Sequence, residues 1–325
     1  MTVTGPAVLG LDIGGTKLAV GVVTEDGRTH GVLVEPTRRD EGPDAVIERL
    51  FVLGERSIEA SGLGSVSAVG VACGGPLDAT AGVLSAPLHL PGWIDIPITD
   101  LAAARFGVPA FLENDATAAA FGEFQFGAGR GVSSMVYLTV STGIGGGAIL
   151  NGQLHRGAAG NGGEFGHVLV RSGGRECLCG RRGCLEVYAS GSSIAARARE
   201  AVADRGAGSS LAKLPEIRAE HVVAAAAAGD ALARELWDET TELLASALTD
   251  LVNVLEPDLV VLGGGVTRSG SALLDPVREA VRRDAMAPAA AAARVELSAL
   301  GDEVGVVGAA AVALDALNKK IHEGV

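Results

Sequence analysis

The residues of this chain that could carry out chemistry are concentrated between Ser141 and Glu186. This segment holds a glycine-rich stretch, then a carboxylate beside an imidazole, then three cysteines: STGIGGG at 141–147, GGEFGH at 162–167 and ECLCGRRGCLE at 176–186. Glycine turns present backbone N–H groups to phosphate, and thiolates with an imidazole bind metal ions. The segment therefore predicts a site that combines phosphate binding, polar side chains and a metal.

The three clustered cysteines and one histidine have the composition of a zinc site. Cys177, Cys179 and Cys184 follow His167 by 10, 12 and 17 residues. Three free cysteines buried in a core are the alternative, but this spacing in a loop of glycine and arginine is not a core pattern. Four protein ligands leave no open coordination position, so we expect a structural Zn²⁺ that holds the loop rigid. The loop would then place two carboxylates, Glu164 and Glu186.

Composition limits the classes of partner. The chain has 325 residues, which favours about two domains. Its 26 basic and 39 acidic residues give a net charge of −13, which disfavours nucleic acid or an anionic membrane as the partner. The first residues lack the basic and apolar regions of a signal peptide, and no alanine tract is long and apolar enough to span a membrane. We therefore expect a cytoplasmic protein.

The first third of the chain predicts a β-hairpin followed by alternating helices and strands. The turn DIGGT (12–16) separates two strands, and the buried strand 66–72 ends in the loop CGGPLD (73–78). Glu113, Asn114 and Asp115 follow a short strand and precede an alanine-rich helix. Such residues can be simple helix caps, but the carboxyl end of a buried strand is also where α/β sheets place ligands. The expected strands are 7–11, one ending at Val23, 30–35, 66–72 and 109–112; the expected helices are 44–61, 98–106 and 116–124.

A repeat indicates a duplicated α/β fold. Residues 135–150 again form strand, glycine turn and strand, and IGGG (144–147) lines up with IGGT (13–16) about 130 residues earlier. Two such turns favour a nucleotide phosphate held from both sides. Further along we expect helices at 192–203, at 221–254 with a break at Gly229–Asp230, at 275–284 and at 305–319. Strands are expected at 259–262, leading into GGGV (263–266), and at 294–298, and the alanine tract 287–293 is expected to be a loop or a helix end.

Taken together, these motifs resemble the ROK family of sugar kinases and repressors. They are LDIGGTK (11–17), ENDA (113–116), STGIGGG, the ExGH of 164–167, CxCGxxGCxE (177–186) and LGGGV (262–266), and the similarity runs from about residue 8 to 315. The resemblance implies an actin-like, ribonuclease-H-like two-domain ATPase fold in which ATP and a hexose meet in an interdomain cleft. A small α/β domain, 1–113, would be completed by the helix 305–320, and a large α/β domain, 114–304, would carry the zinc loop.

The resemblance also implies a role for each matching residue. Asp115 would be the general base that takes the proton of the sugar's 6-hydroxyl. The sugar-binding set would be Asn114, Asp115, Glu164, His167, Glu186 and, along the ring, Gly75 and Pro76. The two phosphate loops would be Asp12, Gly14, Gly15, Thr16 and Lys17, and Ser141, Thr142, Gly143 and Gly145; the adenosine side would be Gly264 and Gly265. The implied cofactors are ATP, Mg²⁺ and structural Zn²⁺ on His167, Cys177, Cys179 and Cys184.

The implied activity is ATP-dependent phosphorylation of a hexose, with glucose as the first candidate. Kinases of N-acetylmannosamine or N-acetylglucosamine share the same chemistry, and a zinc-stabilised binding module would leave both phosphate loops unexplained. A sugar-responsive repressor would need a DNA-binding domain before the first glycine loop, whereas eleven residues precede Asp12. We also expect a dimer or tetramer. One departure concerns sugar choice: His89 stands where many family members have Asn, so we expect it to disfavour an acetamido group, unless it faces solvent or a dimer contact.

Overall fold

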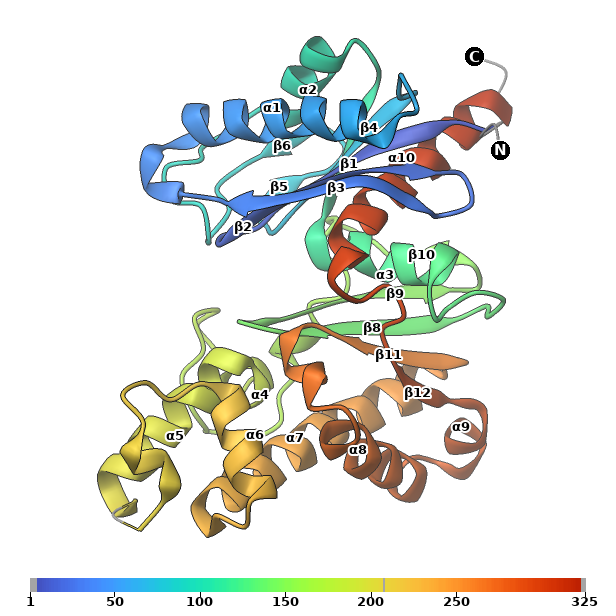
Figure 1. Ribbon diagram of the computed structural model, residues 1–325. Coiled ribbons are helices and arrows are strands. Elements are labelled where there is room, and N and C mark those ends of the chain that lie inside the picture. The colour runs from blue at the N-terminus through green and yellow to red at the C-terminus, as the bar shows by residue number, and fades with distance from the viewer. Residues whose placement is uncertain (1–4, 207, 323–325) are drawn as a thin grey trace. The chain divides into compact units, whose positions relative to one another are not determined.

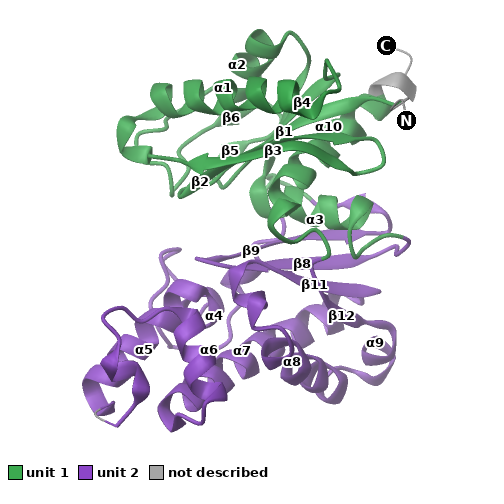
Figure 2. Cartoon of the chain, viewed as in Figure 1, with its two compact units in different colours: residues 1–130, 156–160, 299–325 green, residues 131–155, 161–298 purple. Residues whose placement is uncertain are grey.

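The chain forms two compact units (Figure 2). The structure, a computed structural model, describes residues 5–206 and 208–322. Unit 1 consists of Met1–Arg130, Arg156–Gly160 and Ala299–Val325, and unit 2 consists of Gly131–His155 and Asn161–Ser298. The boundary expected after Glu113 falls inside a strand of unit 1, Ala110–Asn114, and this unit continues to Arg130.

Unit 1 is built on a five-stranded sheet with the order β3-β2-β1-β4-β7 (Figure 1). Strands β1, β2 and β3 are antiparallel neighbours, and β4 and β7 run parallel to β1. The strands are β1 (Ala7–Ile13), β2 (Lys17–Thr24), β3 (Thr29–Pro36), β4 (Ala68–Cys73), β7 (Ala110–Asn114) and the small hairpin β5 (Leu77–Asp78) and β6 (Val83–Leu84). The helices are α1 (Pro43–Ser61), α2 (Ile98–Phe106), α3 (Asp115–Phe126) and α10 (Val304–His322).

Helices cover both faces of this sheet. Helix α1 turns an apolar stripe, including Val46, Leu50 and Leu53, into a core that it shares with α2. Helix α10 packs on the opposite face through side chains such as Val306 and Ala310, and α3 lies against α10. Strands β1, β2 and β4 are apolar on both faces and almost fully buried, so their ends are the places where polar groups can reach solvent or a ligand.

Unit 2 repeats the plan with the order β10-β9-β8-β11-β12. Strands β8, β9 and β10 are antiparallel neighbours, and β11 and β12 run parallel to β8. The strands are β8 (Met135–Val140), β9 (Ile144–Leu150), β10 (Gln153–Leu154), β11 (Leu259–Gly263) and β12 (Arg294–Leu297). The helices, which share one large core with this sheet, are α4 (Glu186–Ala189), α5 (Gly191–Arg205), α6 (Ala219–Ala227), α7 (Ala231–Leu255), α8 (Ser271–Asp284) and α9 (Ala287–Ala292).

The duplicated α/β fold is therefore confirmed, but the alignment of its two glycine turns was wrong. The turn between β1 and β2 is 14–16, and the equivalent turn between β8 and β9 is 141–143. The glycines at 145–147 lie inside β9, where the backbone of 163–166 passes close: a Cβ on Gly146 would lie 2.5 Å from a ring carbon of Phe165. These are packing glycines of a strand, so the structure pairs 141–143, not 144–147, with the first turn.

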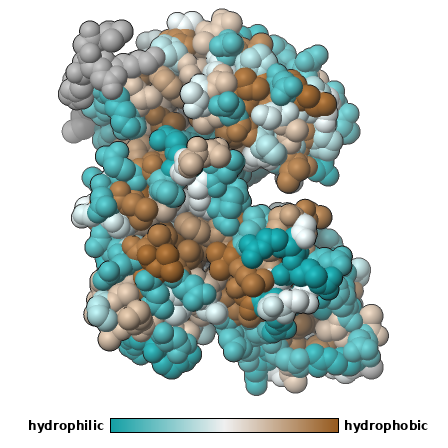
Figure 3. Space-filling model, turned by 180° about the vertical axis from the view of Figure 1, so that it is seen from behind, coloured by the Kyte–Doolittle hydropathy of each residue, from teal (hydrophilic) through white to brown (hydrophobic). Residues whose placement is uncertain are grey.

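Other local differences from the sequence analysis are small. The alanine tract 287–293 forms its own short helix, α9, because Pro288 is tolerated in a first turn and Ala has high helix propensity. The helix expected at 221–254 is broken as predicted, with α6 ending at Ala227 and α7 starting at Ala231. None of the helices in the described part of the chain is long and apolar enough to cross a membrane. The surface mixes hydrophobic with hydrophilic residues (Figure 3), as folded proteins generally do.

Candidate active-site residues

Asp115 is the first residue of α3 and follows directly on β7. The Asn114 side chain caps the helix, since its Oδ1 accepts hydrogen bonds from the N–H groups of Ala116 and Thr117 at 3.0 and 3.1 Å. Asp115 Oδ1 accepts from Ala116 N–H at 2.8 Å. The capping interpretation of this pair is therefore correct for Asn114. It is compatible with a second role, because none of the described residues is bonded to its amide nitrogen, which can still donate.

Two carboxyl groups of unit 1, Asp12 and Asp115, have raised pKa values. Burial raises the pKa of Asp115 above its usual range, although the Ala116 N–H and His89 lower it. Burial, and next the negative charge of Asp115, raise the pKa of Asp12 from 3.8 to about 7, against a lowering by Lys17. A carboxylate with a raised pKa is a better proton acceptor at neutral pH, which is the property that a general base needs.

His89 lies among these groups and is partly buried. Its Nε2 is 3.4 Å from the carbonyl oxygen of Ile13 and 3.9 Å from Cys73 Sγ. A Cβ on Gly74 would lie 2.6 Å from His89 Cε1 and 3.6 Å from an oxygen of Asp115. The imidazole therefore fills the space between the end of β1, the loop after β4 and the start of α3.

Burial raises the pKa of the Cys73 thiol well above 9.0, so that thiol stays protonated.

The first glycine turn is held by a threonine that the sequence analysis did not select. The buried Thr37 donates its hydroxyl to Gly14 O at 2.6 Å, and its N–H to Thr16 O at 3.0 Å. Gly14 N–H donates to Lys17 O at 3.0 Å. Gly15 and Thr16 fill this turn, and Lys17 opens β2 with an exposed side chain. Nothing in the sequence near Thr37 marks it, because it becomes a partner of the turn only through the pairing of β2 with β3.

In unit 2, Glu186 reaches the second glycine turn. Its Oε2 accepts a hydrogen bond from Ile144 N–H at 2.8 Å, and a Cβ on Gly143 would lie 2.7 Å from the same oxygen. Glycine at 143 therefore leaves room for the carboxylate. The expected sugar-binding glutamate and the expected phosphate loop thus form one connected structure.

The same turn is braced by the start of α5 and by the loop after β11. Ser192 Oγ donates to Thr142 O at 2.5 Å, and Gly191 N–H donates to Ser141 O at 2.6 Å. Gly264 adopts a left-handed φ of 87°, and a Cβ there would lie 2.5 Å from Val140 O. Its neighbour Gly265 begins a short helical turn beside Ser141, and Gly145 lies in β9 opposite Thr139. Ser192 was missed because the N-cap of α5 is Ser190, and no local pattern marks a serine at the second position of that helix.

The Cys/His cluster comes together as expected. Ligand atoms of His167, Cys177, Cys179 and Cys184 all lie within 4.8 Å of one another. His167 Nδ1 is 3.5 Å from Cys177 Sγ, and the sulfurs of Cys179 and Cys184 are 3.6 Å apart. Zinc bonds of about 2.3 Å to sulfur and 2.0 Å to nitrogen give tetrahedron edges of about 3.5 to 3.8 Å. The four side chains therefore fit one tetrahedral zinc ion.

His167 also faces Glu164 with its other ring nitrogen. Nε2 lies 3.8 Å from Glu164 Oε2, and the Glu164 side chain is 57% exposed. Glu164 precedes and His167 ends a short 3-10 helix, Phe165–His167, that packs against β9. In unit 2, Glu164, His167 and Glu186 thus lie near the start of β9. The other two expected sugar-site residues, Gly75 and Pro76, belong to unit 1 and lie in the loop after β4.

Comparisons with known proteins identify the family of this chain. The ROK family profile matches residues 8–316. A glucokinase from Thermotoga maritima is 37% identical over 308 residues, covering 94% of this chain and 96% of the relative. The crystal structure of a ROK hexokinase from Thermus thermophilus matches with a TM-score of 0.80 and 36% identity, covering 96% and 99% of the two chains. A ROK family glucokinase from Streptomyces griseus, in complex with glucose and AMPPNP, matches with a TM-score of 0.79 and 32% identity, covering 94% and 98%. A family match across nearly all of the chain, together with these relatives, shows that this protein belongs to the ROK family.

Proposed function

We propose that this protein is an ATP-dependent hexose kinase that transfers a phosphoryl group to the 6-hydroxyl of glucose. The observation that carries the proposal is Asp115, a carboxylate with a raised pKa that helix capping holds at the end of β7. The similarity to glucokinases, one of them solved with glucose and an ATP analogue, supports both substrates.

The chemistry assigned to Asp115 is that of a general base. The 6-hydroxyl oxygen bonds to the γ-phosphorus, the bond from that phosphorus to the β,γ-bridging oxygen breaks, and ADP leaves. The hydroxyl proton passes to the Asp115 carboxylate. Phosphoryl transfer requires mainly positioning and charge neutralisation, so an oriented base needs little further covalent help. Asn114, whose oxygen is used by the helix cap, would donate from its amide nitrogen to a sugar hydroxyl.

The remaining polar residues divide between sugar and nucleotide. Glu164, His167 and Glu186 would bind sugar hydroxyls, with Gly75 and Pro76 along the ring, since a sugar needs several convergent polar groups. Backbone N–H groups of the turns at 14–16 and 141–143 would hold phosphates, Asp12, Lys17 and Gly145 would complete the two loops, and Gly264 and Gly265 would line the adenosine. When bound with ATP, Mg²⁺ supplies charge neutralisation on the phosphates.

The Cys/His cluster would hold a structural Zn²⁺ on His167, Cys177, Cys179 and Cys184. Bound there, zinc supplies rigidity and no open position for catalysis. Its effect on the reaction is indirect: residues 164–186 carry Glu164, His167 and Glu186, so a fixed loop fixes three of the proposed sugar contacts.

A coupled assay of ADP release tests the proposed activity. Glucose, mannose, fructose, N-acetylglucosamine and N-acetylmannosamine are compared at equal concentrations with ATP and Mg²⁺. We expect the highest kcat/KM with glucose, and glucose 6-phosphate as product. A higher kcat/KM with an acetamido sugar would transfer the proposal to that substrate, and no turnover with any hexose would overturn it. The expected dimer or tetramer stays a prediction, for which light scattering on the purified protein is the test.

A further inference from the structure

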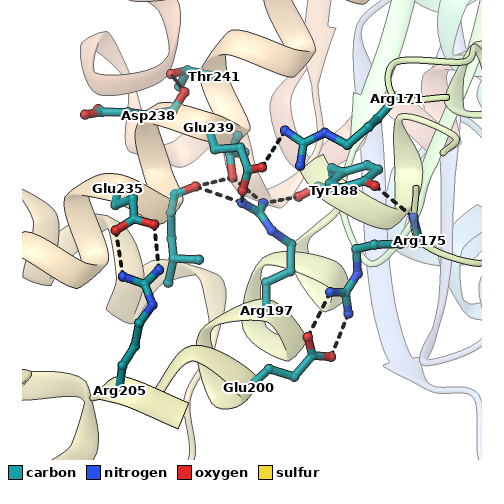
Figure 4. A network of polar contacts seen from close by, with 12 residues as sticks. Arg171, Arg175, Tyr188, Arg197, Glu200, Arg205, Glu235, Asp238, Glu239 and Thr241 are labelled. Carbon is teal, nitrogen blue, oxygen red and sulfur yellow. Dashed lines mark hydrogen bonds and ion pairs between the residues drawn. The ribbon is translucent and has the colours of Figure 1, made fainter. Parts of the chain in front are cut away.

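A network of charged side chains surrounds Tyr188 in unit 2 (Figure 4). Tyr188 is 3% exposed and lies in α4, two residues after Glu186. Its phenol oxygen accepts a hydrogen bond from Arg175 N–H at 2.8 Å. The guanidinium carbons of Arg171 and Arg197 lie 5.2 and 5.9 Å from the centre of its ring. The short helix that begins with Glu186 is therefore held through its tyrosine.

Arg197 of α5 is the buried cation of this network. It is 5% exposed, and its Nη1 donates to Tyr188 O at 2.7 Å and to Thr240 Oγ1 at 2.9 Å. Its Nη2 donates to the carbonyl of Leu236 at 3.4 Å and to the carboxylate of Glu239. Removing one partner from a buried charge is strongly unfavourable, so these acceptors and the guanidinium hold one another in place.

Glu239 of α7 connects Arg197 to the loop that carries the cysteines. Its second oxygen pairs with Arg171 at 2.7 Å. Arg171 lies in one of the two segments that close this loop, 168–171 and 183–185, which are joined by bonds such as Leu185 N–H to Val168 O at 2.9 Å. The network therefore ties both ends of the loop to α5 and α7.

We propose that Arg197, together with Glu239, is a positioning group for Glu186. Arg197 binds the Tyr188 carbonyl, α4 carries Glu186 at its first position, and the Glu186 carboxylate meets the N–H of Ile144 in the glycine turn. The inference rests on the proposed function in one respect, the role of Glu186 in binding the sugar. Arg197 itself contacts no reacting atom, and it acts through the place that it gives to α4.

This support is separate from the Cys/His cluster. Arg171, Tyr188, Arg197 and Glu239 supply no ligand atom to that cluster. The loop is thus fixed twice: the proposed metal joins Cys177 and Cys179 to His167 and Cys184 at the loop ends, and the buried arginine holds the base of the loop through Tyr188 and Glu239. Loss of the base support should move Glu186 while the zinc content stays at one equivalent.

Arg197→Gln tests the positioning role, and the chain offers a matched control. Arg205 also joins α5 to α7, through a paired contact to Glu235 at 2.8 and 2.5 Å, but it is exposed and does not contact α4. We expect Arg197→Gln to lower kcat/KM for glucose by about 10- to 100-fold, since a misplacement near 1 Å can cost that much. Arg205→Gln should stay near wild type, and both variants should keep their zinc by metal analysis.

A double-mutant cycle with Glu186→Gln decides whether Arg197 acts through Glu186. If it does, Arg197→Gln should have little further effect on kcat/KM for glucose once Glu186 is replaced. Additive losses, or a Glu186→Gln variant with wild-type kinetics, would overturn the positioning role. If Arg197→Gln does not fold, Glu239→Gln takes its place in the double-mutant cycle, because Glu239 pairs with both Arg171 and Arg197.

A readout without substrate separates this inference from the proposed function. The amide of Ile144 is bonded to Glu186, so its hydrogen exchange reports the place of that carboxylate in the free protein. We expect faster exchange at Ile144 in Arg197→Gln and unchanged exchange in Arg205→Gln. Unchanged exchange in both variants would contradict the inference even in an active kinase. A protein that phosphorylates no hexose but shows the faster exchange would fail only the proposed function.

Discussion

The two sheets of this protein share one strand order, yet the turns at equivalent places hold different chemistry. In unit 1 the turn after β1 is flanked by ionisable side chains, with Asp12 on the strand before it and Asp115 close by. In unit 2 the turn after β8 is flanked by hydroxyls and backbone groups, and its carboxylate, Glu186, is bonded to a backbone N–H.

Under the proposed function, this difference divides the roles in the reaction between the two halves of a duplicated fold. Burial raises the pKa of Asp115 even though Ala116 N–H donates to its carboxylate, so this group can accept a proton. Glu186 is held by a hydrogen bond from Ile144 N–H, and its proposed role is that of a fixed acceptor for sugar hydroxyls. The shared topology therefore places a turn at the same position in each unit. The side chains around that turn then decide whether it serves proton transfer or sugar binding.

Among the changes that test this difference between the two units, Asp115→Asn should have the largest effect on kcat. It keeps the shape of the side chain and the Asn114 cap but removes the proton acceptor, so kcat should fall by about 100- to 10,000-fold while glucose binding changes little. The matched control is Asp100→Asn, at an exposed position in the first turn of α2. Steady-state kinetics and calorimetric titration with glucose measure both quantities. An Asp115→Asn enzyme that keeps more than about a third of kcat would remove Asp115 from the role of base.

The next largest effect is expected at the metal cluster of unit 2. Cys184→Ser should lose the single equivalent of zinc and about 10- to 100-fold in kcat/KM, because the segment that carries Glu164 and Glu186 is no longer held by the metal. Metal analysis of the purified proteins gives the stoichiometry. Cys73→Ser changes the cysteine outside the cluster and should keep the zinc. Clearly less than half an equivalent in active wild-type enzyme would contradict the zinc assignment.

A smaller effect, on the choice of sugar, is expected at His89 of unit 1. His89 fills the space between Gly15 and Gly74 beside Asp115, so we expect it to exclude an acetamido group and favour glucose over N-acetylmannosamine by at least about tenfold in kcat/KM. His89→Asn should narrow that ratio. Both sugars are measured with both enzymes. An unchanged ratio would show that His89 takes no part in selectivity, and a wild-type preference for the acetamido sugar would contradict glucose as the substrate.

The smallest expected effect concerns stability and pH. Because the pKa of Asp12 is raised from 3.8 to about 7, the folded protein binds this proton more tightly than the unfolded chain does. The free energy of unfolding should therefore fall as the pH rises between about 4 and 7. Asp12→Asn cannot ionise, so its Tm relative to wild type should be higher at pH 8 than at pH 5, in protein free of nucleotide and Mg²⁺. A difference in Tm that does not change with pH would contradict the raised pKa.

Sequence reasoning predicted those parts of the fold and site that rest on local patterns. The junction at Asn114 and Asp115, the spacing of the cysteines and the break before α7 are short-range features, and each appears where it was expected. Thr37, Ser192 and Arg197 were missed, because each becomes important through a partner far along the chain. The turn alignment failed for a related reason: glycines that make room for a crossing segment look the same in sequence as glycines that make a turn.

The place of α10 has a consequence for the order in which the chain can fold during synthesis. This helix supplies Val306, Val307 and Ala310 to the core on one face of the first sheet, and a Cβ on Gly70 of β4 would lie 1.9 Å from its Ala309 carbonyl. A ribosome makes α10 only after all of unit 2. Unit 2, whose segments run from Gly131 to Ser298, can therefore bury its core while the earlier strands of unit 1 still expose one apolar face. Domains usually fold in the order of their synthesis, from the N-terminus, and here the later unit should be finished first.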